Sequence, residues 1–274
     1  MSLEYEPQPC ASPLEYFGYE LRRLREEAGK TQDELASIIN YSSAHVSAVE
    51  NAKRSPRKDF AMGCDAALET GDHFVRLWRD LRRALYRPVV RSYFELEATA
   101  IRVRTFEPIL IPGLLQTEAY ARAVIRGNMV AEDDDRIESR VAERRERQNI
   151  LNGEGGPMLL AVMEESVLHR PIGGPHTMRE QLQHLLVVAE RPKITLQLIP
   201  VTVGAHPGLQ GPITLLSFPG SPEVAYFDNA GGGEIVGRPE DVAGACCRFD
   251  APRAEALPQG ASIELIRRAM DRWI

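Results

Sequence analysis

The sequence predicts two domains: an all-α domain of five helices, followed by a larger domain of mixed α+β (or α/β) structure. Up to residue 86, apolar residues recur at the three- and four-residue spacing of amphipathic helices. After residue 89, short apolar runs bounded by Gly and Pro alternate with helical segments. Arg87-Pro88 separates the two patterns, because a proline disfavours helical geometry in the residue before it. We therefore expect a mobile tail over residues 1–13, a helical domain over 14–87 and a mixed domain over 88–274.

The first two helices are marked by their end signals and their apolar stripes. The first begins at Leu14 and ends at Gly29, a residue favoured just after a helix. Its stripe consists of Phe17, Leu21, Leu24 and Ala28. Thr31 and Glu34 have the spacing of a capping box that starts the second helix. The expected inner face of that helix consists of Leu35, Ala36, Ile38 and Ile39.

The third helix follows a short turn at Asn40-Tyr41, and Ser42 is a favourable N-cap for it. A projection at about 100° per residue points Val46 and Val49 inward. Two further helices are expected over Asp59–Glu69 and from Asp72 to about Tyr86. The inward residues of the last helix are Phe74, Leu77, Trp78, Leu81 and Leu85.

The mixed domain has its own succession of strands and helices. Strand-like runs cover residues 98–108, 157–164, 193–200, 212–218 and 223–228. Helical segments cover residues 112–127, 132–151, 177–190, 239–256 and 260–273.

Residues 30–56 have the form of a helix-turn-helix motif, in which the second helix enters the major groove of DNA. The alternative is an ordinary helical hairpin. The outer face of the third helix carries only small or uncharged residues, and Lys53-Arg54 and Arg57-Lys58 follow it. Such a face allows close approach to a groove, with phosphate contacts beside it. The pattern therefore favours DNA binding over a plain hairpin.

The stretch "LRRLREEAGKTQDELASIINYSSAHVSAVENAKRSP" resembles the XRE-type helix-turn-helix family, which includes phage repressors of the lambda type. The resemblance implies that Gln32 and the loop from Asn51 to Arg54 bind phosphates. It implies a structural salt bridge between Arg25 and Glu50. The positions that it places toward base edges are Ser43, Ala44, Ser47 and Ala48. The expected DNA-binding set is Gln32, Ser42, Ser43, Ala44, Ser47, Ala48, Asn51, Lys53 and Arg54.

Two positions of this stretch depart from the family, which usually has glycine where Asn40 and Ala52 stand. Asparagine tolerates a left-handed turn, whereas alanine is strained there if its φ is positive. Asn51 is the one outer residue that could hydrogen-bond an adenine, so base readout must depend on serine hydroxyls and alanine methyls. With so few strong base contacts, we expect a homodimer on double-stranded DNA that also reads DNA shape.

The larger domain resembles the WhiJ-like regulators of actinobacteria in its pieces "PGLLQT" and "GAHPGL" and weakly at "YFDNAGGGEIVG". In that family an XRE-type domain precedes a domain of unassigned function, and members are commonly encoded beside a very small partner protein. The resemblance implies a transcriptional regulator whose C-terminal domain binds a small partner protein or a ligand, with an antitoxin-like role.

The competing hypothesis is an enzyme tethered to DNA by its N-terminal domain. Glu164, Glu165 and four histidines (His169, His176, His184 and His206) are the residues from which a site could be built. Adjacent carboxylates face opposite sides of a strand, and the histidines lack metal-ligand spacing. No GxSxG, HExxH or Walker sequence occurs. We therefore expect no catalytic residues, no metal and no cofactor.

Composition restricts where the protein works and how it could hold DNA. The net charge is −6, so contact with DNA must come from local cations rather than a global field. Four cysteines lack metal-ligand spacing, and adjacent Cys246-Cys247 could not close a bridge without strain. No apolar run reaches the roughly 18–20 residues that span a bilayer, and no secretory pattern is present. These observations predict a cytoplasmic protein.

Overall fold

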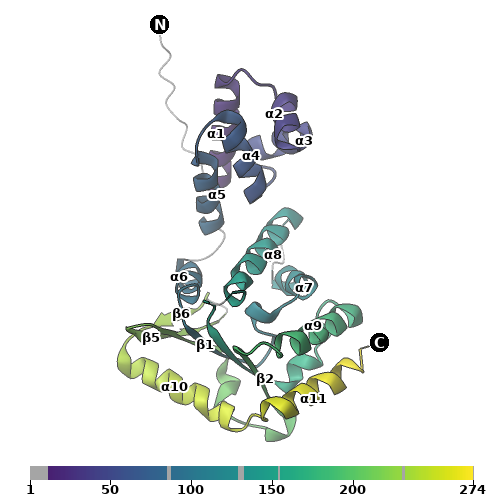
Figure 1. Cartoon of the computed structure of the whole chain (residues 1–274), viewed down its shortest axis with the longest axis vertical. Coiled ribbons are helices and arrows are strands. Elements are labelled where there is room, and N and C mark those ends of the chain that lie inside the picture. The colour runs from purple at the N-terminus through teal and green to yellow at the C-terminus, as the bar shows by residue number, and fades with distance from the viewer. Residues whose placement is uncertain (1–11, 85–87, 129–132, 154, 230–231, 274) are drawn as a thin grey trace. The chain divides into compact units, whose positions relative to one another are not determined.

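The computed structural model describes residues 12–84, 88–128, 133–153, 155–229 and 232–273. By its internal contacts the chain divides into two compact units, residues 1–87 with 133–139 and residues 88–132 with 140–274. The predicted fold class is confirmed, since a helical region is followed by a six-stranded mixed sheet with helices (Figure 1). The predicted tail, 1–13, lies outside the described residues except for Ser12 and Pro13. Those two residues begin the first helix.

The first unit contains the five expected helices. They are α1 (Pro13–Glu27), α2 (Gln32–Ile39), α3 (Ser43–Glu50), α4 (Lys58–Leu68) and α5 (His73–Ala84). The capping box of Thr31 and Glu34 is present at the start of α2, and the hydroxyl of Ser42 accepts the His45 amide proton at the start of α3. These local signals set the helix starts, as the sequence predicted.

The core of the first unit is built from the predicted stripes, with errors at Ile38 and Ala28. Its largest buried residues are Phe17, Leu21, Leu35, Val46, Val49, Phe60, Phe74, Trp78 and Leu81. Ile38, which we placed on the inner face of α2, is 52% exposed. It projects about 100° from the direction shared by Leu35, Ala36 and Ile39, so α2 turns it toward solvent. Leu24 and Leu77 are only partly buried, Ala28 is exposed, and Leu85 lies outside the described residues.

The chain leaves α3 through a turn that the sequence marked as strained. Ala52 has φ 55°, in the left-handed region, and Lys53 N donates to Ala48 O at 2.8 Å. This is the Schellman arrangement, which usually has glycine where Ala52 stands. Asn40 has φ 57° at the end of α2, where asparagine is tolerated. Both departures from glycine therefore occupy left-handed positions.

The second unit is built on one six-stranded sheet. Its strands are β1 (Arg102–Glu107), β2 (Met158–Glu164), β3 (Ile194–Ile199), β4 (Ile213–Phe218), β5 (Ser221–Phe227) and β6 (Glu234–Val236). The order is β3-β2-β1-β4-β5-β6, with β1, β2 and β3 parallel and the remaining pairs antiparallel. Parallel neighbours need crossover connections, and helices supply them between β1 and β2 and between β2 and β3.

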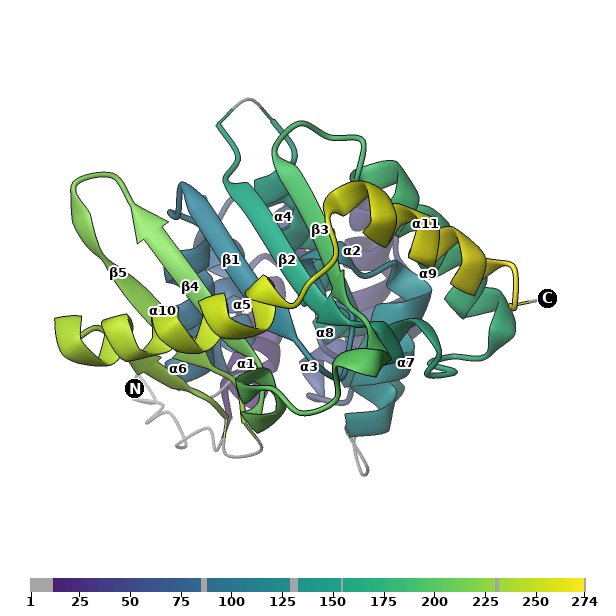
Figure 2. The same cartoon turned by 90° about the horizontal axis from the view of Figure 1, so that it is seen from below.

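Helices cover both faces of this sheet (Figure 2). They are α6 (Pro88–Glu97), α7 (Glu118–Asn128), α8 (Asp134–Gln148), α9 (Pro175–Val188), α10 (Pro239–Ala254) and α11 (Gln259–Met270). Alternation along β1 sends Val103 into the core beneath α9 and α11, and Phe106 into the core beneath α10. Both faces are thus buried, which explains the continuous apolar runs of β2 and β4.

The structure corrects the predicted elements of the second unit in three places. The helix expected over 112–127 is broken: a 3-10 turn covers Gly113–Leu115, and α7 starts at Glu118. The backbone of Gln116 is extended and is held by two hydrogen bonds of 2.7 Å. The side-chain amide of Gln116 donates to Ile111 O, and the main-chain carbonyl of Gln116 accepts from the side chain of Gln148. Helix α6 and the three-residue strand β6 were not predicted. Each depends on packing against distant parts of the chain.

We predict that Ala52→Gly stabilises the first unit by about 0.5–1 kcal/mol, because glycine adopts a positive φ without steric cost. The matched control is Gly29→Ala, since Gly29 has φ 67° and an added Cβ would meet nothing within 4 Å. This control should destabilise by about the same amount through backbone strain alone. Chemical denaturation of the full chain measures both changes, and a loss of stability in Ala52→Gly would contradict the prediction.

Candidate nucleic-acid interface

The candidate interface is centred on α3, which is held from beneath. Val46 and Val49 are fully buried against the core of the first unit. On α1, Gly18 lies so close to α3 that an added Cβ would stand 2.6 Å from Val49 O. Two helix backbones can approach this closely only where one lacks a side chain. Contacts of the inner face and of the C-terminal end therefore fix the position of α3. Its outer face is not needed for these contacts.

The outer face of α3 carries the residues expected to meet base edges. Ala44 is exposed, and Ser43, Ser47 and Ala48 are half-buried. None of the four has a charge or a bulky side chain. Ser42 is exposed, and its hydroxyl caps α3, so its role in the structure is to begin the helix. The face is small enough for its backbone to come close to a groove floor.

The predicted phosphate-binding residues fall into two environments. Lys53 and Arg54 are exposed on the loop that follows α3. Gln32, at the start of α2, instead directs its amide at Glu50, with Nε2 donating to Oε2 at 2.7 Å. The family resemblance groups Gln32 with the phosphate-binding loop. In the structure its side chain instead belongs to a polar network around Glu50.

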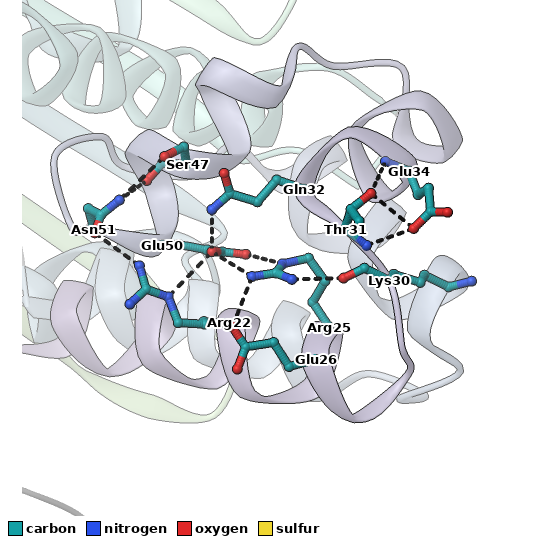
Figure 3. Close-up of polar contacts among 10 residues, drawn as sticks. All are labelled: Arg22, Arg25, Glu26, Lys30, Thr31, Gln32, Glu34, Ser47, Glu50 and Asn51. Carbon is teal, nitrogen blue, oxygen red and sulfur yellow. Dashed lines mark hydrogen bonds and ion pairs between the residues drawn. The ribbon is translucent and has the colours of Figure 1, made fainter.

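That network surrounds the carboxylate of Glu50, in the last turn of α3 (Figure 3). Arg25 on α1 donates to it twice, from Nε at 2.6 Å and from Nη2 at 3.1 Å. The side chain of Glu50 is fully buried, and that of Arg25 is 8% exposed. Arg25 also donates to Lys30 O at 2.7 Å. The salt bridge implied by the family resemblance is present, and it connects α1, α2 and α3.

Arg22 is a residue of this site that the sequence reasoning missed. Its Nη2 donates to Asn51 Oδ1 at 3.1 Å, and its Nε lies 3.5 Å from Glu50 (Figure 3). Asn51 Nδ2 in turn donates to Ser47 O at 2.7 Å. The spacing of Gly18, Arg22 and Arg25 on α1 could have revealed it, because residues four and three apart share one helix face.

His45 is a second residue that the sequence reasoning missed. Its ring packs against Tyr41 and Phe60, at centroid distances of 4.6 and 5.3 Å. Burial, followed by the charge of Arg54, lowers the pKa of His45 below its usual value. The imidazole is then neutral near pH 7, and Nδ1 can accept from Arg54 Nη1 at 3.0 Å. The ring is thereby one of two partners of Arg54, whose guanidinium also pairs with Asp135 at 3.1 Å.

The second unit holds a polar cluster on the sheet face that α6 and α8 cover. Thr105 and Thr214 hydrogen-bond across β1 and β4, and Tyr226 on β5 stacks on Tyr93 of α6. Glu97 accepts from Tyr93 at 2.6 Å and pairs with Arg147 at 2.8 Å, and only 1% of its side chain is exposed. These residues occupy positions where an apolar core is usual.

Glu107, at the end of β1, lies on the same face of the sheet as Thr105, two residues before it on the strand. Burial, and then the charge of Asp228, raise the pKa of Glu107 to about 8. Arg144 and Arg147 act in the opposite direction but do not overcome these effects. A carboxyl group that stays protonated near neutral pH is typical of binding and catalytic sites. This was not visible in the sequence, where Glu107 is one acid at the end of a strand.

The residues considered for an enzyme site come together only as pairs. Glu164 accepts from His206 Nε2, and the other ring nitrogen of His206 accepts from Gly208 N at 3.2 Å. Only 3% of the His206 side chain is exposed. His169 lies 3.7 Å from Glu165, whereas His176 is 86% exposed beside Glu180. With both nitrogens engaged and almost no exposed surface, His206 holds the "GAHPGL" loop in place rather than facing a substrate.

Among the residues that the structure describes, no group of three or more His, Cys, Asp or Glu side chains is placed to hold a metal ion. Within the same part of the chain, every helix is too short or too polar to cross a membrane.

Comparison with known families finds two matches. Residues 90–268 match the domain of unknown function DUF5753, and residues 17–78 match a helix-turn-helix domain. The first match covers more than half of the chain, and the second covers all of α2 and α3 and the turn between them. No curated protein and no solved structure matches the chain.

We predict that Arg25→Met destabilises the first unit by about 3 kcal/mol, because it removes the two close hydrogen bonds to the buried Glu50 and leaves only the longer contact with Arg22 as an ion pair. The matched control is Arg76→Met, whose partner Asp72 is as exposed as Arg76 itself. An exposed pair of this kind contributes at most about 0.5 kcal/mol. Denaturant unfolding measures the free energy of unfolding of both variants. Equal losses of stability in the two variants would show that Glu50 does not need Arg25.

We predict that the second unit loses stability as the pH rises from about 5 to about 8. The folded state keeps a proton on Glu107 up to a pKa of about 8, whereas the unfolded chain releases it near 4.5. An acid whose pKa is raised on folding contributes stability that is fully present below the pKa of the unfolded chain. This stability is lost as the pH rises through the pKa of the folded state. Glu107→Gln should flatten this slope, and Asp228→Asn should reduce it. Calorimetry over this pH range measures it, and an unchanged slope in Glu107→Gln would refute the assignment.

Proposed function

The chain belongs to the family of the domain of unknown function DUF5753, and from the helix-turn-helix domain that precedes it we propose a sequence-specific DNA-binding regulator of transcription. The observation that carries this proposal is the outer face of α3. Its side chains are small and uncharged, with Ala44 exposed and the others half-buried, whereas Val46, Val49 and Glu50 are buried. The resemblance to XRE-type regulators supports the same function.

Because the net charge is −6, attraction to the DNA phosphates must come from local positive charge. Lys53 and Arg54 follow α3 directly, and Arg57 and Lys58 come next, at the start of α4. All four are exposed. Cations beside a recognition helix contact phosphates and carry no sequence information themselves. Base readout then falls to Ser43, Ala44, Ser47 and Ala48.

Four small side chains give one α3 little power to select a site. We therefore propose that the protein binds as a homodimer, with two copies of α3 in half-sites about one helical turn, or a multiple of that, apart. DNA shape would add to the selection where no side chain reaches a base.

For the second unit we propose the binding of a small partner protein or a ligand, by which regulation is controlled in the cytoplasm. The resemblance to WhiJ-like regulators supports a partner and an antitoxin-like role. The polar cluster around Glu107 supports a ligand, because a carboxyl group whose pKa is raised to about 8 is typical of functional sites. An enzyme tethered to DNA is the alternative, and the enclosed His206 gives it little support.

The experiment is a selection of DNA fragments from a random pool, followed by affinity measurements across a salt series. Lys53→Ala and Arg54→Ala should weaken binding to selected and random DNA alike and reduce the salt slope by roughly one. Ser47→Ala and Ala48→Leu should instead change the preference for selected DNA and leave the salt slope unchanged, because they alter the groove-facing surface. Selected fragments should contain the same half-site twice.

Two results would contradict this scheme. If the wild-type protein enriches no sequence and binds no DNA, the proposed function is wrong. If Arg54→Ala alters sequence preference while Ser47→Ala and Ala48→Leu leave it untouched, α3 is not the reading helix.

A further inference from the structure

The guanidinium of Arg54 is bound to an acid of the first unit. Its Nε donates to Asp135 Oδ2 at 3.1 Å, and its Nη2 donates to Asp135 Oδ1 at 3.3 Å. Its third nitrogen, Nη1, lies 3.0 Å from Nδ1 of His45. Asp135 stands in the first turn of α8, 81 positions after Arg54, and residues 133–139 are part of the first unit.

The start of α8 is held beside the loop that follows α3. Asp133 Oδ1 accepts the amide proton of Arg136 at 2.8 Å, as an N-cap residue does. Ile137, one residue further on, is buried. Lys53, Asp133 and Asp135 line the same groove, which has a volume of about 270 Å³. The place of the Asp135 carboxylate beside the loop is therefore set by the packing of its helix.

A carboxylate in this place competes with a DNA phosphate for the same donors. An arginine binds an anion with two parallel N–H groups, which are either Nε and Nη2 or Nη1 and Nη2. In Arg54, Asp135 occupies the first pair of nitrogens, and His45 lies at Nη1 of the second pair. A phosphate can thus form a bidentate pair with Arg54 only if it displaces one of these partners. The carboxylate also offsets the positive charge that attracts a phosphate.

The pair of Arg54 and Asp135 is weak enough for DNA to displace. The side chain of Arg54 is 43% exposed, and that of Asp135 is 37% exposed. Ion pairs with this exposure contribute little to stability, because water screens the attraction between the two charges. Loss of the pair when DNA binds should lower the affinity for DNA by roughly 2- to 5-fold without preventing binding.

We propose that Asp135 inhibits DNA binding from within the chain, because its carboxylate occupies the nitrogens of Arg54 that a phosphate needs. This inference rests on the proposed function and gives that function a point of control. Residues 140–148 of α8 are part of the second unit, so both units contribute residues to the helix that carries Asp135. A ligand of the second unit that stabilises another position of α8 would therefore change the affinity for DNA.

The test measures the affinity for DNA of the wild type, Asp135→Asn, Arg54→Ala and the double variant Asp135→Asn/Arg54→Ala. The probes are one fragment selected by the wild type and one unselected fragment. Asp135→Asn should raise the affinity for both fragments by roughly 2- to 5-fold and leave the preference between them unchanged. This gain should be absent from the Arg54→Ala background, where Asp135 has no guanidinium to hold.

Asp72→Asn is the matched control, because it breaks an exposed pair with Arg76 elsewhere in the first unit. Its affinity for both fragments should match that of the wild type. Asp135→Ser removes the same carboxylate as Asp135→Asn, and it decides the question if Asp135→Asn is poorly folded.

Two results would overturn the inference. An unchanged or lower affinity in the folded variant that lacks the Asp135 carboxylate would show that Asp135 does not compete with DNA. A gain of the same size in the Arg54→Ala background would show a general effect of negative charge and no competition for Arg54. Absence of binding to any fragment, both by the wild type and by Asp135→Asn, would count against the proposed function instead.

Discussion

The first unit depends on one unfavourable charge, the buried carboxylate of Glu50. It stands in the last turn of α3, where the partial negative charge of a helix end already opposes it. Burial adds the cost of removing a charge from water. The carboxylate is retained because Arg25, Gln32 and Arg22 surround it with donors from α1 and α2. A group that would be destabilising alone therefore becomes the point at which three helices are joined.

This constraint explains how so short a helix can serve as a rigid reading surface. An isolated helix of eight residues is not stable in water. The outer face of α3 contributes little to its stability, since its side chains are small and none of them is fully buried. Val46, Val49 and Glu50 attach the helix together with the ring of His45 against Phe60, and Gly18 brings α1 close to it. Because attachment and recognition use opposite faces, the outer residues can vary without loss of the fold.

The sequence predicted what is local and missed what depends on contacts between distant residues. Thr31, Glu34 and Ser42 act within one turn of themselves, and their caps were predicted correctly. The two resemblances added the helix-turn-helix motif and the salt bridge of Arg25 and Glu50. Ile38 was misplaced because an apolar residue at the edge of a stripe looks the same as one inside it. Gln116 breaks a helical pattern through hydrogen bonds to residues as far away as Gln148.

The candidate site shows the same division between local and distant information. The residue types on the outer face of α3 follow from helical projection. That Gln32 turns inward, and that Arg22 holds Asn51, follows from distances between helices that no local pattern contains. In the second unit, the raised pKa of Glu107 arises from desolvation and from the charge of Asp228, which is 121 positions later in the sequence.

The two units differ in the surroundings of one carboxyl group each, Glu50 in the first unit and Glu107 in the second. In the first unit the buried carboxylate of Glu50 receives donors from three side chains, so it stabilises one fixed arrangement. In the second unit, Glu97 is paired with Arg147, whereas the charge of Asp228 helps to raise the pKa of Glu107. A carboxyl group whose pKa is raised on folding lowers the stability of the folded state at a pH where the unfolded chain ionises it. The buried carboxylate of the first unit therefore fixes one arrangement, whereas the stability of the second unit changes when Glu107 gains or loses its proton.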